Sequence, residues 1–152
     1  MPRAYRPMRA EGEPLRPVIG DSATRLGVRE RDLAPDNEGN ARPRQGGMSV
    51  VSSVGGLRRR IARQIFSPGM VPQRLSDSGL VPGAIGPNSL HLFRIGNGSF
   101  ELAVLTDRLM LVPDRDDHGT VQPEAVIPYQ EFKQAIYDTR DQWVSGEADD
   151  DC

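Results

Sequence analysis

Short apolar segments rich in strand-forming residues, separated by polar stretches and by glycine or proline, predict β-strands. These segments are residues 3–9, 47–53, 89–95, 99–105, 108–112 and 121–127. Gly96-Asn97-Gly98 separates two of them and supplies residues that accept a positive φ. We therefore expect residues 89–105 to form a β-hairpin.

Two segments follow the helical period instead. A helix is expected to open at Pro128, where proline is tolerated in the first turn, with four apolar residues on one face. These residues are Tyr129, Phe132, Ile136 and Trp143. A second short helix is expected over residues 57–66. Few short helices, with most strands in the second half of the chain, indicate an α+β fold.

Long loops rich in glycine and proline separate the predicted elements. Glycine contributes 16 and proline 13 of the 152 residues, so much of the chain is turn and loop. We expect a single domain over residues 1–145, in which 55–88 is an insertion between core strands. The segment 146–152, which is rich in acidic residues, is expected to be a disordered tail.

The net charge is −2, but the charges are distributed unevenly. Residues 1–63 hold 13 arginines against seven acidic residues, whereas residues 64–152 hold six basic residues against 14 acidic ones. Such asymmetry is typical of a basic binding face and equally of two solvated surfaces. Nucleic acid therefore stays open as a partner.

The expected location follows from patterns that the sequence lacks. No secretory signal pattern is present, and no apolar run approaches the roughly 20 residues that cross a bilayer. Cys152 is the only cysteine, and with two histidines it does not form a zinc set. We expect a protein made in the cytoplasm, without a membrane partner or a metal site. An export route that needs no signal stays open.

Two segments contain candidate site residues. Paired glycines precede Ser49 in the segment 46–50, and glycine occurs where a backbone approaches a ligand or another chain closely. His118 begins the later segment 118–123, which reads as a strand. Neither segment identifies a function alone.

Four segments, taken in order, resemble the ADP-ribosyltransferase-like toxin domains of type VI secretion effectors and bacterial polymorphic toxins. They are Tyr5-Arg6, a loop that leads into Gly46-Gly47-Met48-Ser49-Val50, the strand from His118 to Pro123, and a helix ending in Thr139-Arg140-Asp141-Gln142-Trp143. The resemblance implies a split β-sheet core that grips NAD, the substrate, across a central cleft.

The resemblance also implies roles for particular residues. Arg6 would bind the pyrophosphate, with Tyr5 and Gly47 beside it, and Ser49 would orient the ribose. The reaction breaks the bond between nicotinamide and ribose through an oxocarbenium-like state, whose developing charge must be stabilised.

The catalytic set implied by the resemblance is Ser49, His118 and Glu124. The family places a glutamate on a late strand, preceded two residues earlier by Glu or Gln. Gln122-Pro123-Glu124 has that spacing, but we expect Pro123 to break a central strand. His118 is the other late polar candidate.

The leading interpretation is therefore a toxin or effector domain, an NAD-dependent ADP-ribosyltransferase that modifies an intracellular target. A cognate immunity protein would protect the producing cell. One alternative is a non-enzymatic phosphate- or RNA-binding domain on the same fold, using Arg6, Arg44 and the arginines of 58–63. Another is a hydrolase with Ser49, His118 and Asp107, although Ser49 lacks the Gly-x-Ser-x-Gly elbow.

Overall fold

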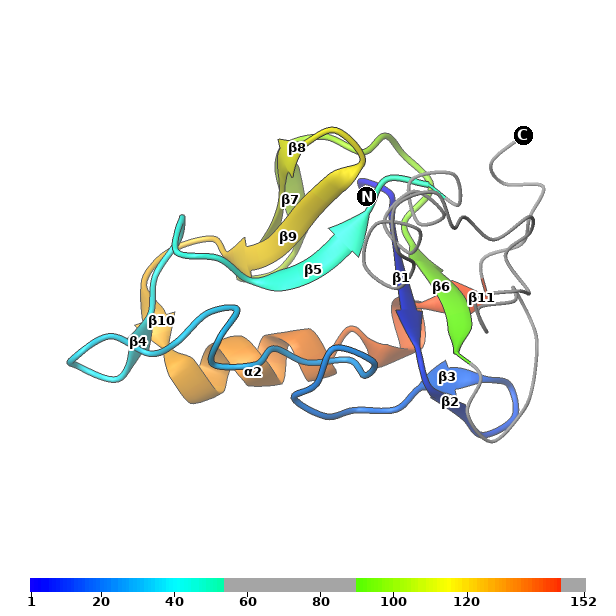
Figure 1. Cartoon of the computed structure of the whole chain (residues 1–152), viewed down its shortest axis with the longest axis horizontal. Helices are drawn as coiled ribbons and strands as arrows, with labels where there is room; N and C mark the ends of the chain where they lie inside the picture. Colours follow the sequence, from blue (N-terminus) through cyan, green and yellow to red (C-terminus); the bar gives the residue numbers. More distant parts are fainter. Residues whose placement is uncertain (54–89, 146–152) are drawn as a thin grey trace, which may run out of the picture.

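The computed structural model describes residues 1–53 and 90–145. These residues form a seven-stranded antiparallel sheet, two small two-stranded ladders and one α-helix (Figure 1). The helix, α2, spans Tyr129–Tyr137 and is followed by the 3-10 helix η2, Arg140–Gln142. The expected combination of sheet and short helix is confirmed at this level.

The large sheet has a spatial order that differs from the chain order. Its strands are β11 (Val144–Ser145), β6 (His91–Ile95), β1 (Ala4–Met8), β5 (Met48–Val51), β9 (His118–Pro123), β8 (Leu109–Arg115) and β7 (Ala103–Thr106). The small ladders join β2 (Ala10–Glu11) to β3 (Arg16–Pro17) and β4 (Asn40–Ala41) to β10 (Ile127–Pro128).

The junction between β1 and β5 is the narrow point of the large sheet, because these two strands share fewer register pairs than any other neighbouring strands in it. Tyr5 and Val51 are the single register pair there, whereas β1 and β6 share five pairs and β5 and β9 share four. The sheet therefore consists of two parts, β11-β6-β1 and β5-β9-β8-β7, which stand at an angle to each other in Figure 1.

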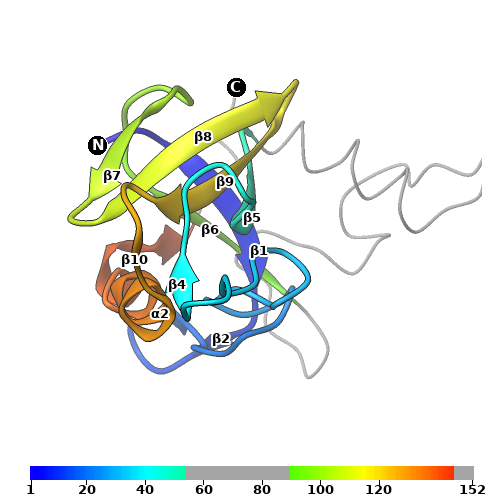
Figure 2. The same cartoon turned by 90° about the vertical axis from the view of Figure 1, so that its left-hand side faces the viewer.

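One face of the sheet packs against α2, which lies to one side of the strands in Figure 2. The predicted apolar stripe is confirmed for Tyr129, Phe132 and Ile136, which are buried on α2, but the expected continuation of the helix to Trp143 is wrong because α2 ends at Tyr137. Trp143 is also buried but lies beyond η2, where its indole Nε1 donates a 2.9 Å hydrogen bond to Thr139 Oγ1. Full burial of an Ile or Phe side chain, as at Phe132 and Ile136, stabilises the fold by about 1.5–3 kcal/mol relative to leaving the side chain exposed.

The expected hairpin over residues 89–105 is wrong. Strand β6 pairs with β1 and β11, and β7 pairs with β8. The reason lies at the glycine turn, which contacts the start of the chain instead of folding back on itself. Gly98 N donates to Met1 O, and Arg3 N donates to Ser99 O, each at 3.0 Å.

Several expectations concern residues outside the described parts of the chain. The insertion 55–88, its helix 57–66 and the acidic tail 146–152 all lie there. Among the residues that the structure describes, no helix has the length and apolarity needed to cross a membrane.

Candidate active site

The two faces of the central strands carry different side chains. Successive strand residues point to opposite faces, so Met48 and Val50 lie with the core on the α2 side. Ser49 pairs with Thr120 and Val51 with His118 across β5 and β9. By this alternation Ser49, Thr120 and His118 share the face opposite the core.

Ser49 and His118 meet on that face. The Ser49 Oγ lies 3.1 Å from the His118 Nε2, within hydrogen-bonding distance. The two residues are diagonal neighbours in the ladder, where polar side chains of adjacent strands can still touch. His118 is 6% exposed and Ser49 is half-buried, so the pair is shielded without being sealed in.

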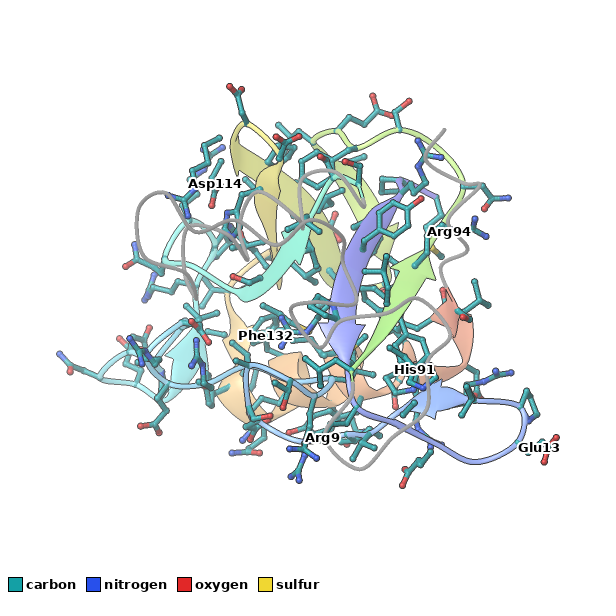
Figure 3. All side chains as sticks on the ribbon, turned by 45° about the vertical axis from the view of Figure 1, so that its right-hand side comes forward. Arg9, Glu13, His91, Arg94, Asp114 and Phe132 are labelled. Carbon is teal, nitrogen blue, oxygen red and sulfur yellow. The ribbon has the colours of Figure 1, made fainter. Side chains whose placement is uncertain are left out.

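Asp114 contacts the other nitrogen of the same imidazole. Its Oδ1 lies 2.6 Å from the His118 Nδ1. The register of β8 against β9 shifts between Pro113 and Arg115, and such an irregularity can redirect the side chain of the intervening residue. Figure 3 shows Asp114 near the end of the sheet, far from Phe132 in the core.

These contacts favour one tautomer of His118. An ionised carboxylate only accepts hydrogen bonds, so the contact with Asp114 favours the tautomer whose Nδ1 carries the proton. In that neutral tautomer the Nε2 lone pair accepts a hydrogen bond from the Ser49 hydroxyl. A hydroxyl, an imidazole and a carboxylate in this order make a general base aimed at an oxygen nucleophile.

Arg6 contacts the backbone of Ser49, but its side chain is buried in the protein. Its guanidinium donates four hydrogen bonds to three backbone carbonyls, those of Ser22, Arg25 and Ser49. The side chain is 4% exposed, and burial lowers its pKa to about 10, so it stays cationic at neutral pH. The expectation that Arg6 presents its fork to a pyrophosphate is corrected here, because that fork holds the backbone.

The remaining predicted cofactor residues also have partners within the chain. A side chain at Gly47 would collide with the Val121 carbonyl of β9, so glycine is needed for strand pairing. Gly46 has a φ of +117° and packs against the Asp32 carbonyl. Tyr5 is fully buried beside Val51. The paired glycines are therefore explained by close packing of the chain on itself.

Glu124 is not part of this group. It is exposed, lies one residue beyond β9, and its N–H donates to Arg108 O. It lies six positions after His118, roughly 20 Å along an extended strand. Gln122 is buried, accepts a hydrogen bond from Arg44 N and donates one to Thr120. The predicted Gln-x-Glu pair is thus separated from Ser49.

Pro123 does not break β9, contrary to the expectation from the sequence. The ladder between β5 and β9 ends at the pair Met48–Val121, two residues earlier. Beyond that point β9 pairs only with β8, where Leu109 is the partner of Pro123. The missing N–H of proline therefore costs no hydrogen bond to β5.

The alternatives considered from the sequence fit less well. Asp107 has a side chain that is 98% exposed at the turn between β7 and β8, so the carboxylate beside His118 is Asp114 instead. Arg6 is buried, and the arginines of 58–63 lie outside the described residues. Within residues 1–53 and 90–145, no three His, Cys, Asp or Glu side chains are grouped to hold a metal ion.

A separate pocket of about 560 Å³ lies beside the start of α2. Its lining includes Asp21, Arg29, Tyr129 and Lys133 but neither Ser49 nor His118. Both of its cations are paired with carboxylates, since Lys133 Nζ lies 2.7 Å from Asp21 and Arg29 Nε lies 2.8 Å from Asp32. This pocket is therefore separate from the contact between Ser49 and His118.

Comparison with known protein families, curated proteins and solved structures finds no match for this chain. Any function assigned to it therefore depends on the residues and the geometry described above. Sequence patterns identified Ser49 and His118 as candidates but missed Asp114. The only signal for Asp114 is its position four residues before His118, across a turn rich in aspartate.

Proposed function

We propose that the chain is an NAD-dependent ADP-ribosyltransferase domain of a toxin or effector, with Ser49 and His118 as its catalytic pair. One observation carries the proposal. Arg6, Ser49 and His118 come from three distant segments, and two hydrogen bonds join them in series beside the narrow junction of the sheet. The resemblance to ADP-ribosyltransferase-like toxins requires these three segments to converge.

The reaction assigns a task to each group. As the bond between nicotinamide and the ribose C1 breaks, its electron pair leaves with nicotinamide, and an oxocarbenium-like ribose remains. The acceptor oxygen attacks C1 and gives its proton to the His118 Nε2. The Ser49 hydroxyl, released from the imidazole, orients the ribose. In this scheme His118 takes the place that the family gives to a glutamate on a late strand.

Arg6 supports the site from behind. Its Nη1 holds the Ser49 carbonyl at 2.6 Å, which fixes the strand that carries the hydroxyl. A buried cation one peptide away also contributes a positive potential, which favours an anionic ligand such as a pyrophosphate. Arg6 thus acts by position and charge, without a direct contact to the phosphates.

The biological role follows from the chemistry. An enzyme that modifies a target inside cells would harm the cell that makes it, so a cognate immunity protein is required. The surface that such a partner must cover is the face with Ser49 and His118.

Labelling of target proteins tests the proposal. A bacterial lysate is incubated with the purified protein and NAD labelled in its adenylate phosphate. The wild type is expected to transfer label to a discrete acceptor, and His118→Ala is expected to transfer at least ~100-fold less. Thr120→Val is a matched control on the same strand face, since the Thr120 hydroxyl accepts a hydrogen bond from Gln122, and only its backbone pairs with Ser49. Equal labelling by wild type and His118→Ala would overturn the proposal.

A second candidate function is favoured by the same hydrogen bonds. Ser49, His118 and Asp114 are ordered as in serine hydrolases, where the hydroxyl attacks a carbonyl. That reaction also needs donors for the developing oxyanion. A fluorophosphonate probe separates the two functions. Stoichiometric labelling of Ser49 without transfer of ADP-ribose would assign the hydrolase.

A further inference from the structure

We propose that Asp114 is the positioning residue for His118, fixing the ring and its proton so that the lone pair of Nε2 faces the reacting oxygen. This inference rests on the proposed function only in assigning His118 as the base. The arrangement of the proton is a property of the free protein. It can therefore be tested without NAD.

The geometry of the β8–β9 hairpin supports this role. The Asp114 Oδ1 lies 2.6 Å from Nδ1, while Ser49 Oγ lies 3.1 Å from Nε2, so both ring nitrogens are engaged at once. The register shift in β8 falls at Asp114 itself. Because such an irregularity can redirect a side chain, it accounts for the contact between the Asp114 carboxylate and the His118 imidazole.

The surroundings identify Asp114 as the partner that sets the tautomer. Among the described residues, Arg115 forms an ion pair with Asp114, with its Nε 3.9 Å from the Asp114 Oδ1, and the two side chains are 68% and 42% exposed. Asp117, in the turn before His118, is engaged with Ser52, whose Oγ donates to it at 2.9 Å. The Asp114 carboxylate, at 2.6 Å, is within hydrogen-bonding distance of Nδ1.

A purely structural role for Asp114 is a separate possibility that the same variants address. Its side chain is 42% exposed, and the turn that it borders is held independently. Ser52 N donates to Asp117 O at 3.1 Å, and its hydroxyl contacts the same residue. Asp114→Ala should therefore leave the fold intact.

Nitrogen NMR of histidine gives the direct readout. The chain has two histidines, so labelling with ¹⁵N-histidine yields two imidazoles, and His118→Ala assigns them. His91 is an internal reference, because burial lowers its pKa and keeps it neutral at mildly alkaline pH. We expect a pyrrole-type Nδ1 and a pyridine-type Nε2 for His118 in the wild type, and a shift toward the opposite tautomer in Asp114→Ala.

Turnover supplies the second readout. Asp114→Ala is expected to reduce ADP-ribose transfer about 10- to 100-fold, less than His118→Ala, because it removes orientation and leaves the base in place. Asp107→Ala is the matched control, with a side chain that is 98% exposed at the preceding turn, and should change neither readout.

The outcomes separate this inference from the proposed function. A wild-type His118 with its proton on Nε2, or an unchanged tautomer in Asp114→Ala, would overturn the role of Asp114. The expected tautomers in a protein that never cleaves NAD would support the role of Asp114 and overturn the transferase alone. Loss of turnover with unchanged nitrogen shifts would also count against positioning.

Discussion

The Nη1 of Arg6 donates a 2.6 Å hydrogen bond to the carbonyl of Ser49, although 43 residues separate them in the chain. The bond crosses from β1 to β5 beside the single register pair that joins the two parts of the sheet. A buried arginine is costly unless its donors are satisfied, and here carbonyls accept from all three of its nitrogens. Arg6 therefore links β1 to the loop that contains Ser22 and Arg25, and it holds the backbone of Ser49 in place.

Arg6→Ala is expected to lower the free energy of unfolding by about 2–5 kcal/mol, because buried carbonyls lose their donor. Arg6→Lys should recover only part of this loss, since an ammonium cannot reproduce the planar fork. Urea unfolding measures both. Arg108→Ala is the control, with a half-exposed side chain paired to Glu131, and should cost no more than about 1 kcal/mol. Arg6→Ala stability equal to that control would contradict the role assigned to Arg6.

Ser49→Ala is expected to leave stability nearly unchanged and to reduce turnover, by about 10- to 1,000-fold. The hydroxyl contacts His118 and is half-buried, so its loss affects the reacting group more than the core. Initial rates of ADP-ribose transfer at several NAD concentrations measure the effect on kcat and KM. Ser52→Ala is a matched control, because that hydroxyl binds Asp117 instead. An equal effect of both variants would remove Ser49 from the site.

Local sequence patterns predicted α2, because its apolar residues all pack on one face of the helix. The stripe of Tyr129, Phe132 and Ile136 identified α2 because helical spacing and burial coincide there. The predicted hairpin was wrong because the turn Gly96-Asn97-Gly98 packs against Met1. A turn pattern in the sequence does not determine which strands pair with each other. Pairing between distant strands depends on tertiary packing, which alternation alone does not encode.

The candidate site was predicted in part for similar reasons. Ser49 and His118 were identified, and the structure brings them together. The direction of Arg6 was not predictable, because its carbonyl partners come from a loop with no periodic pattern. Asp114 was missed because an irregularity in β8, absent from any alternation pattern, puts its carboxylate beside His118.

Glu124→Gln is expected to retain ADP-ribose transfer within about threefold of the wild type. Its side chain is exposed, and it lies roughly 20 Å along the strand from His118. Transfer to the lysate acceptor, measured beside His118→Ala, gives the comparison. A loss greater than tenfold in Glu124→Gln would return the glutamate to the catalytic set and weaken the role assigned to His118.

Stability is expected to fall in acid because of Asp21. Burial alone would raise the pKa of Asp21, but hydrogen bonds from Lys133 and Tyr137 outweigh it, so its pKa lies below 3.8. A lowered carboxyl pKa contributes stability above the unfolded value, and that contribution is lost as pH falls through the folded value.

Asp21→Asn should therefore destabilise the protein at pH 7 more than at pH 3. Urea unfolding at the two pH values gives the difference. Asp141→Asn is the control, because that side chain is 86% exposed and its single ion-pair distance is 3.4 Å. A destabilisation by Asp21→Asn that does not change with pH would contradict the assigned ion pair.

Release of nicotinamide from NAD tests the central claim most directly. The purified protein is incubated with a bacterial lysate and NAD labelled in the nicotinamide ring, and free nicotinamide is counted over time. We predict release by the wild type and by Glu124→Gln, and at least ~100-fold slower release by His118→Ala of unchanged stability. No release by the wild type, or equal release by His118→Ala, would contradict the claim that Ser49 and His118 form an NAD-cleaving site.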